Sequence, residues 1–198
     1  MRRCAEFPRR QMLAGLLAAT ASPAGAWQPF AGAIPDVPLL DQSRRRWRFR
    51  SEVLAQRPAV AVELVYTGCT TICPISTRIM AEARGALDSR ERAGLRCISL
   101  SLDPATDTPE RLRSYAEAVG ATEAAEAGDW LFLTGAQTDV TTVLRAFRRQ
   151  FGRPEDHAPV FFVGDGRVPR LAQLFALPPP EELTAAMGTA LRGAIPKG

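Results

Sequence analysis

Residues 59–74 read AVAVELVYTGCTTICP, and this stretch decides the fold class. Its first eight residues form an almost continuous apolar run bounded by a proline and a glycine, which predicts a buried β-strand. Cys69 and Cys73 follow with three residues between them, and Pro74 suits the first turn of a helix. The sequence therefore places two thiols where a core strand passes into a helix.

The position of the two thiols limits the chemistry that they can perform. A helix N-terminus favours negative charge, so we expect a thiolate at Cys73 to be stabilised there, and we expect the junction to keep both thiols near the surface. Thiolates in such a place exchange disulfides or hold a soft metal such as Cu(I), and the two are not exclusive. A purely structural disulfide, or a pair of buried small apolar residues, explains Cys69 and Cys73 less well. Closing so short a loop adds little stability in the chain-entropy model, and the junction is expected to keep the thiols near the surface.

Further apolar segments alternate with helical patterns along the chain. After the thiols, Ile75, Ile79, Ala83 and Leu87 predict the apolar face of a helix. Later strands are expected at 95–102, 130–133, 159–163 and 167–174, later helices at 107–120, 140–151 and 181–191, and a small hairpin within 39–49.

This alternation predicts an α/β structure with crossover connections. A dithiol at the carboxyl end of the first core strand is the arrangement of a thioredoxin-like fold. We therefore expect three layers, a mixed central sheet with flanking helices, and an N-terminal hairpin extension.

The N-terminus is best interpreted as an export signal over residues 1–26. Basic residues precede an apolar stretch from 12 to 21, which is too short to span a bilayer, and Ala24–Ala26 offers a small-residue cleavage site. The pair Arg9-Arg10 favours the twin-arginine route over an ordinary secretory signal. We expect residues 27–198 to form one domain that is periplasmic and soluble after cleavage.

The charge balance excludes a nucleic-acid-binding class. The chain has 25 basic and 21 acidic residues, and residues 1–26 contain four arginines and one glutamate. Residues 27–198 are therefore almost neutral, with no basic excess to bind phosphates. A Ser-His-Asp hydrolase and a phosphate-binding loop are also excluded, because no serine elbow and no glycine-rich loop occur.

His157 is the one histidine in the chain and precedes the expected strand at 159–163. In a thioredoxin-like sheet, the loop that enters this strand lies beside the dithiol. Two thiolates and an imidazole suit three-coordinate copper, whereas zinc is disfavoured because it usually takes a fourth ligand. Asp156 is a candidate for orienting the imidazole, with a solvated loop carboxylate as the alternative.

Four other residues have simpler expected roles. Pro159 is a candidate for a cis peptide bond facing the dithiol. Cys97 lies in the middle of a strand and is expected to be a buried, inert thiol. Asp103 and Asp107 are expected to be turn and cap residues at a strand-to-helix junction.

Four segments together resemble the Sco/SenC family. The first is Tyr66–Pro74 with the two cysteines, and the second is Ser99–Pro104 with Asp107–Pro109. The third is Asp129–Gly135, and the fourth is Asp156-His157 before an apolar strand. The resemblance covers roughly residues 36–192, in the family's order and spacing.

The resemblance implies a thioredoxin-like fold in which Cys69, Cys73 and His157 hold copper, as Cu(I) or Cu(II). It also implies delivery of copper to the binuclear copper centre of cytochrome c oxidase, or reduction of the cysteines of that centre. The implied partners are the copper-bearing oxidase subunit or another copper chaperone, and a periplasmic thiol reductant. Many members keep an uncleaved membrane anchor, and the residues around His157 differ from the commonest family version.

Three hypotheses follow from these residues. The first is a copper-binding metallochaperone that transfers its metal and has no catalytic turnover. The second is an enzyme, a thiol-disulfide oxidoreductase or thiol peroxidase, which needs Cys69 and Cys73 as a redox-active pair but not His157. The third is a copper or redox sensor.

Overall fold

The computed structural model describes residues 28–29, 33–149, 153–168 and 170–194. The expected export signal at 1–26 lies outside these residues, so it stays a prediction. In the described part of the chain, no helix is long and apolar enough to cross a membrane.

A six-stranded mixed sheet forms the centre of the molecule, in the order β1-β8-β7-β4-β5-β6. Strands β4, β5 and β6 are parallel, whereas β7, β8 and β1 run antiparallel to their neighbours. The strands are β1 (Gln28–Pro29), β4 (Ala59–Val65), β5 (Leu95–Ser101), β6 (Trp130–Leu133), β7 (Val160–Asp165) and β8 (Arg170–Phe175). The predicted α/β, thioredoxin-like fold with a mixed sheet is confirmed.

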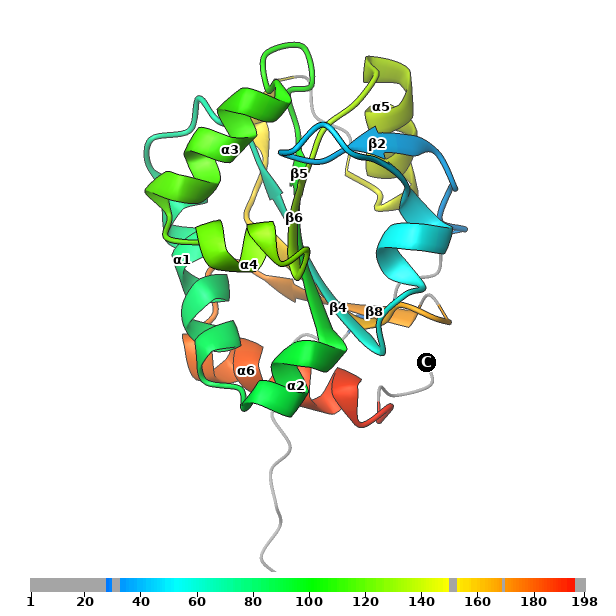
Figure 1. Ribbon diagram of the computed structural model, residues 1–198, viewed down its shortest axis with the longest axis vertical. Helices are drawn as coiled ribbons and strands as arrows, with labels where there is room; N and C mark the ends of the chain where they lie inside the picture. The colour runs from blue at the N-terminus through cyan, green and yellow to red at the C-terminus, as the bar shows by residue number, and fades with distance from the viewer. Residues whose placement is uncertain (1–27, 30–32, 150–152, 169, 195–198) are drawn as a thin grey trace, which may run out of the picture.

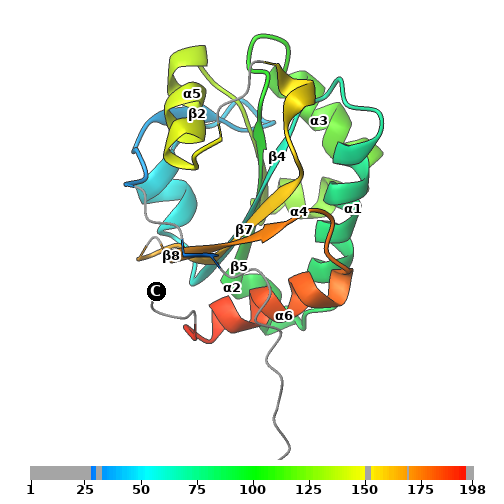
Figure 2. The same cartoon turned by 180° about the vertical axis from the view of Figure 1, so that it is seen from behind.

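Helical segments cover both faces of this sheet, as Figures 1 and 2 show from opposite sides. Helices α1, α3, α4 and α6 enclose one apolar core, and α5, η1 and the hairpin β2–β3 enclose the other. The bounds are β2 (Pro38–Leu40), β3 (Arg46–Arg48), η1 (Phe49–Leu54), α1 (Ile72–Gly85), α2 (Ser89–Gly94), α3 (Pro109–Ala118), α4 (Thr122–Glu126), α5 (Gln137–Ala146), η2 (Pro154–Asp156) and α6 (Pro180–Leu191).

The predicted apolar face of α1 is partly wrong. Ala83 and Leu87 are buried, but Ile75 is 49% exposed. The first turns instead bury Cys73, Ser76 and Thr77. Polar side chains can occupy this face because they find hydrogen-bond partners there, as described below.

The expected hairpin within 39–49 is confirmed and covers the edge strand β6. Its turn is held by Asp41, which accepts hydrogen bonds from the backbone N–H groups of Ser43 and Arg45 and from the indole of Trp47. Leu40 and Thr134 exchange backbone hydrogen bonds, which join the hairpin to the chain just after β6.

Gln42, in the turn of the hairpin, forms hydrogen bonds to helix α4 and to strand β6. Its Nε2 atom donates to the carbonyl of Ala125 at 3.1 Å, and its Oε1 atom accepts from the backbone N–H of Phe132 at 3.0 Å. The Gln42 side chain is 4% exposed, so water does not replace these bonds.

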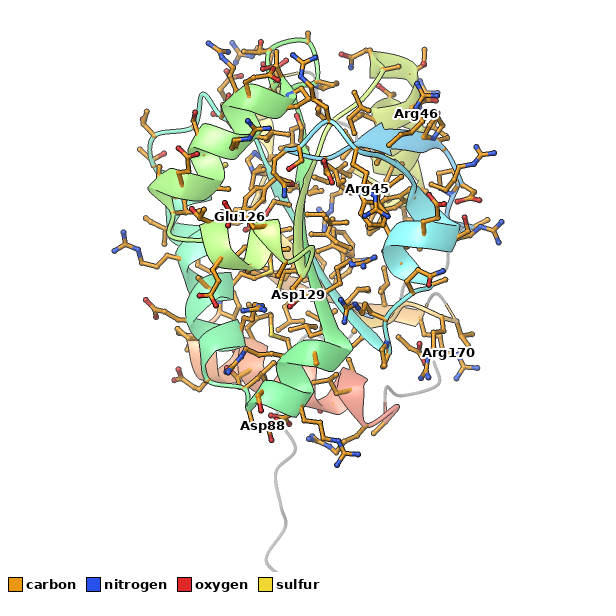
Figure 3. The ribbon with its side chains drawn as sticks, viewed as in Figure 1. Arg45, Arg46, Asp88, Glu126, Asp129 and Arg170 are labelled. Carbon is orange, nitrogen blue, oxygen red and sulfur yellow. The ribbon has the colours of Figure 1, made fainter. Side chains whose placement is uncertain are left out.

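Asp129, labelled in Figure 3, joins three segments at the start of β6. Its carboxylate lies 2.8 Å from the guanidinium of Arg57 and 3.4 Å from that of Arg84 in α1. These half-buried ion pairs connect the loop between η1 and β4, helix α1 and strand β6 at the end of the sheet opposite the two cysteines.

Replacing Gln42 with alanine is expected to destabilise the protein by about 2 kcal/mol, because two buried backbone groups lose their partners. Chemical denaturation followed by circular dichroism measures this free energy of unfolding. Gln137→Ala is the matched control, since that side chain is exposed and bonds to Thr141 on its own helix. Equal stability of the two variants would contradict this role of Gln42.

Candidate thiol and metal site

Strand β4 delivers the chain to the site, and α1 begins there. All seven residues of β4 are buried between β5 and β7, so its carboxyl end is held in place. The following loop carries Cys69, and Cys73 lies in the first turn of α1. Sequence analysis therefore placed both thiols correctly at a strand-to-helix junction.

The thiols are more buried than the junction suggested. Cys73 is 0% exposed and Cys69 is 7% exposed, so the expectation of thiols near the surface is wrong. Both are free, and both belong to the apolar core on the α1 face. Tyr66 and Ile72 pack against this core beside them and account for the burial.

The backbone at the start of α1 stabilises a thiolate at Cys69. Burial alone raises the pKa of Cys69, but hydrogen bonds from the N–H groups of Cys73, Thr71 and Ile72 outweigh it and lower the pKa to about 7. The Cys73 N–H lies 3.3 Å from the sulfur of Cys69. Unpaired N–H groups at a helix start are natural donors to an anion.

Cys73 behaves in the opposite way. Burial raises the pKa of the Cys73 thiol well above its ordinary value, and the neighbouring Cys69 and Glu63 raise it further. The expectation that Cys73 carries the stabilised thiolate is therefore wrong. The N–H groups of the first turn point back toward the loop, where the sulfur of Cys69 lies.

Asp107 braces the loop that carries Cys69. The carboxylate is 1% exposed and accepts hydrogen bonds from the N–H and hydroxyl of Thr67, at 3.0 and 2.6 Å, and from the hydroxyl of Ser101 at 2.6 Å. The cap of α3 is Thr108, which accepts from the N–H of Arg111. The expectation that Asp107 is a cap is thus wrong, whereas Asp103 does form the predicted turn, its carbonyl accepting from Asp107.

His157 lies beside Tyr66, the residue that also contacts Cys69. Its ring is 6.0 Å from the ring of Tyr66, centroid to centroid, in an edge-to-face arrangement. Tyr66 is also close to Cys69: burial, followed by the charge of Cys69 and a hydrogen bond to it, raises the pKa of Tyr66 to about 12. Tyr66 therefore contacts both candidate ligands, and sequence analysis gave its side chain no role.

The imidazole of His157 has a defined tautomer. Its Nδ1 atom is 2.7 Å from the carbonyl of Pro154, which can only accept, so Nδ1 carries the proton. Burial lowers the pKa of His157, and the hydrogen bond to Pro154 only partly offsets this effect. The lowered pKa favours the neutral ring. The carboxylate of Asp156 is half exposed and lies 3.6 Å from the guanidinium of Arg153. The group that orients the imidazole is therefore the carbonyl of Pro154, and not Asp156 as one hypothesis expected.

Two other expectations concern residues near the site. No peptide bond in the described residues is cis, so Pro159 follows a trans bond and that hypothesis is wrong. Cys97 is fully buried in β5, and burial raises its pKa to about 12. Its predicted burial is confirmed, and a protonated buried thiol is inert.

The side chains present suit a soft cation, although they do not all converge. The structure brings Cys69 and Cys73 together, and the imidazole of His157 lies beside Tyr66. Within the described ranges, no group of three His, Cys, Asp or Glu side chains is arranged to hold a metal ion. Two sulfurs and an imidazole nitrogen are nevertheless the donor set that a soft metal prefers.

Sequence comparison identifies relatives of the chain. A family model described as SCO1/SenC matches residues 44–168. The chain is 32% identical over 115 residues to the SCO1 protein homolog of Bacillus subtilis strain 168, covering 54% of this chain and 57% of that protein. A second relative, from Stutzerimonas stutzeri, is 33% identical over 87 residues, which is 41% of its length. The chain thus spans about half the length of these curated relatives.

Solved structures share the fold. BsSco, described as a member of the Sco family of cytochrome c oxidase assembly proteins with a disulfide switch, matches with a TM-score of 0.68 at 22% identity, over 84% of this chain and 97% of that one. Bradyrhizobium japonicum ScoI with copper bound matches with a TM-score of 0.59 at 20% identity, over 83% and 99%. At these identities the likeness establishes the fold, and the family model covers more than half of the sequence: the chain belongs to the SCO1/SenC family.

Proposed function

We propose that this protein binds Cu(I) through Cys69, Cys73 and His157 and acts in the assembly of cytochrome c oxidase. It would deliver copper to the binuclear centre or reduce the cysteines of that centre. The observation that carries the proposal is the pair of free thiols, in which the sulfur of Cys69 accepts a hydrogen bond from the backbone N–H of Cys73 at 3.3 Å. The family and the copper-bound relative support the choice of metal.

Copper loading requires two changes in the protein. Cys73 must lose its proton, so binding releases protons to solvent and weakens as the pH falls. The described residues do not form a three-ligand group as they stand, so His157 and the sulfurs must move closer together. Because Nδ1 donates to Pro154, the metal bond would use Nε2. A ligand that must move into place permits release of the metal to a partner by ligand exchange.

The cellular setting belongs to the same proposal. The basic and apolar start of the chain supports export to the periplasm, with residues 27–198 working there as a soluble domain after cleavage. The partners would be the copper-bearing oxidase subunit or another copper chaperone, with a thiol reductant to keep the cysteines reduced.

The reduced protein is expected to bind one Cu(I) per chain, and His157→Ala to weaken binding at least tenfold, as loss of one ligand implies. Titration against a Cu(I) chelator measures both. Arg153→Ala, on the same loop but exposed, is the matched control and should bind like the parent. If the protein does not bind Cu(I), or if His157→Ala binds Cu(I) as tightly as the parent, the proposed copper site is wrong.

A thiol-disulfide oxidoreductase is the second candidate, favoured by the unequal thiols. Cys69, with a pKa of about 7, has the properties of an attacking thiolate, and the protonated Cys73 those of a resolving thiol. This activity would not need His157, which separates it from copper binding.

Alkylation by iodoacetamide is expected to report the thiolate of Cys69. The rate should be low at pH 5, rise through pH 7 and level off by pH 8, because only the thiolate reacts and its pKa is about 7. Mass spectrometry of the labelled peptides locates the reaction, and Cys69→Ser should abolish it. A rate that keeps rising to about pH 9, as for an ordinary thiol, would show that the backbone N–H groups do not stabilise the anion.

A further inference from the structure

Arginine side chains line a cleft beside the amino end of β5, which is the end of that strand away from the thiols. The cleft has a volume of about 480 Å³ and lies where the hairpin β2–β3, the loop between η1 and β4, and the loop before β6 meet. Its lining includes Arg45, Trp47, Arg57 and Arg96, with Glu52 as a carboxylate. The proposed copper site uses none of these residues.

Arg96 is a buried cation whose donors are only partly used. The residue is 6% exposed, and its Nη1 atom donates to the carbonyls of Glu52 at 2.8 Å and Val53 at 3.0 Å. In the described part of the chain, its Nε and Nη2 atoms have no hydrogen-bond partner, and no carboxylate forms an ion pair with its guanidinium. A buried charge is costly unless it is paired. The contact with η1 therefore explains one nitrogen of Arg96 and leaves two.

The neighbouring arginines add to this unbalanced charge. Burial, and after it the charge of Arg57, lowers the pKa of Arg96 to about 10, and the charge of Arg45 lowers it further, against the charge of Asp129. Arg57 is balanced, because its Nη2 atom lies 2.8 Å from the carboxylate of Asp129. Arg45 is exposed and forms no ion pair with the described residues. Two guanidinium groups at the cleft, one exposed and one buried, thus lack a counterion within the described chain.

The indole of Trp47 lies against both of these cations. The guanidinium carbon of Arg45 is 3.8 Å from the centre of the ring, and that of Arg96 is 5.3 Å from it. Asp41 fixes the ring by accepting a hydrogen bond from its Nε1 atom at 2.8 Å. Because the ring has no net charge, these contacts stabilise the two cations without neutralising them.

The shape and charge of the cleft favour an organic carboxylate. A planar guanidinium donates two parallel N–H groups to the two oxygens of a carboxylate. Glu52 and Asp129 lie at or beside the cleft, and they repel a doubly charged phosphate more than a singly charged carboxylate. The cleft also has an aromatic wall and a volume within the range of about 300–1,000 Å³ that small-molecule sites occupy.

We propose that this cleft is a binding site for a small organic acid, whose carboxylate accepts hydrogen bonds from Arg45 and Arg96 and whose apolar part lies against Trp47. Nη2 is the donor that Arg96 offers, since Nε is enclosed by the protein. The bound acid supplies the counterion that the fold does not give to Arg96. The inference goes beyond the proposed function and involves neither the thiols nor His157.

Benzoate is a suitable probe, because it joins one carboxylate to a small apolar ring, and benzamide is its uncharged control. Each is titrated into the purified, reduced protein at constant ionic strength, while NMR follows the indole N–H signal of Trp47. We expect this signal to shift with saturation as benzoate is added and to stay in place with benzamide. Benzoate should also raise the unfolding temperature, because a ligand of the folded state stabilises it. Inorganic phosphate, the third titrant, should bind more weakly than benzoate.

Three variants locate the site. Arg45→Gln should weaken benzoate binding about tenfold or more, as the loss of a hydrogen bond between charged groups implies. Arg46→Gln is the matched control: it removes the same charge from the next residue, which Figure 3 shows on the side of the hairpin away from Asp129. Because solvent and salt screen this exposed charge, the control should change the affinity by less than about twofold. Arg96→Lys keeps the buried charge but removes the planar group, so it should also weaken binding.

The outcome does not depend on whether every variant folds. Arg45 is exposed, so its replacement leaves the fold intact and decides the matter even if Arg96→Lys unfolds. Equal binding of benzoate and benzamide, or equal losses in Arg45→Gln and Arg46→Gln, would overturn the site. Tighter binding of phosphate than of benzoate would overturn the choice of a carboxylate. These titrations contain no copper, so their failure leaves the proposed function untouched, and failure to bind Cu(I) leaves this cleft untouched.

Discussion

The site depends on how β4 is held. This strand pairs with β5 on one side and β7 on the other, and each of its seven residues is buried. Because the strand cannot shift, the loop that follows it leaves the sheet at one place, and α1 must start there. Backbone N–H groups at that start have no partner within the helix, and the sulfur of Cys69 accepts from them. The lowered pKa of the Cys69 thiol is thus a consequence of where a fully paired strand ends.

Buried polar groups gather around this junction and are sparse in the rest of the same core. Asp107 ties the loop to β5 through Thr67 and Ser101, and Glu63 ties α1 to β5 through Ser76 and Ser99. An unpaired carboxyl in either place would cost several kcal/mol, and the hydroxyl partners remove most of that cost. The two carboxyls differ in consequence. Asp107 positions the loop, whereas Glu63 remains able to change its charge within the core.

Much of the fold could be predicted because it depends on local patterns. The apolar runs at 59–66, 95–102 and 130–133 became β4, β5 and β6 with boundaries shifted by at most one residue. Helix faces were less predictable, as Ile75 shows, because a helix can bury a hydroxyl side chain such as Ser76 when the sheet offers it a hydrogen-bond partner. That partner is Glu63 in strand β4, so the pattern of residues within α1 does not reveal it.

The sequence by itself determined the α/β class, the pair of thiols at a strand-to-helix junction, and the histidine that precedes β7. Spacing and hydrophobic pattern suffice for these, since each is a property of neighbouring residues. Only the tertiary structure decided that Cys69 and not Cys73 carries the stabilised thiolate, that Pro154 orients His157, and that a carboxyl lies behind the thiols. The pKa of a thiol and the tautomer of an imidazole depend on burial and on hydrogen bonds in three dimensions, which come from segments that the sequence keeps apart.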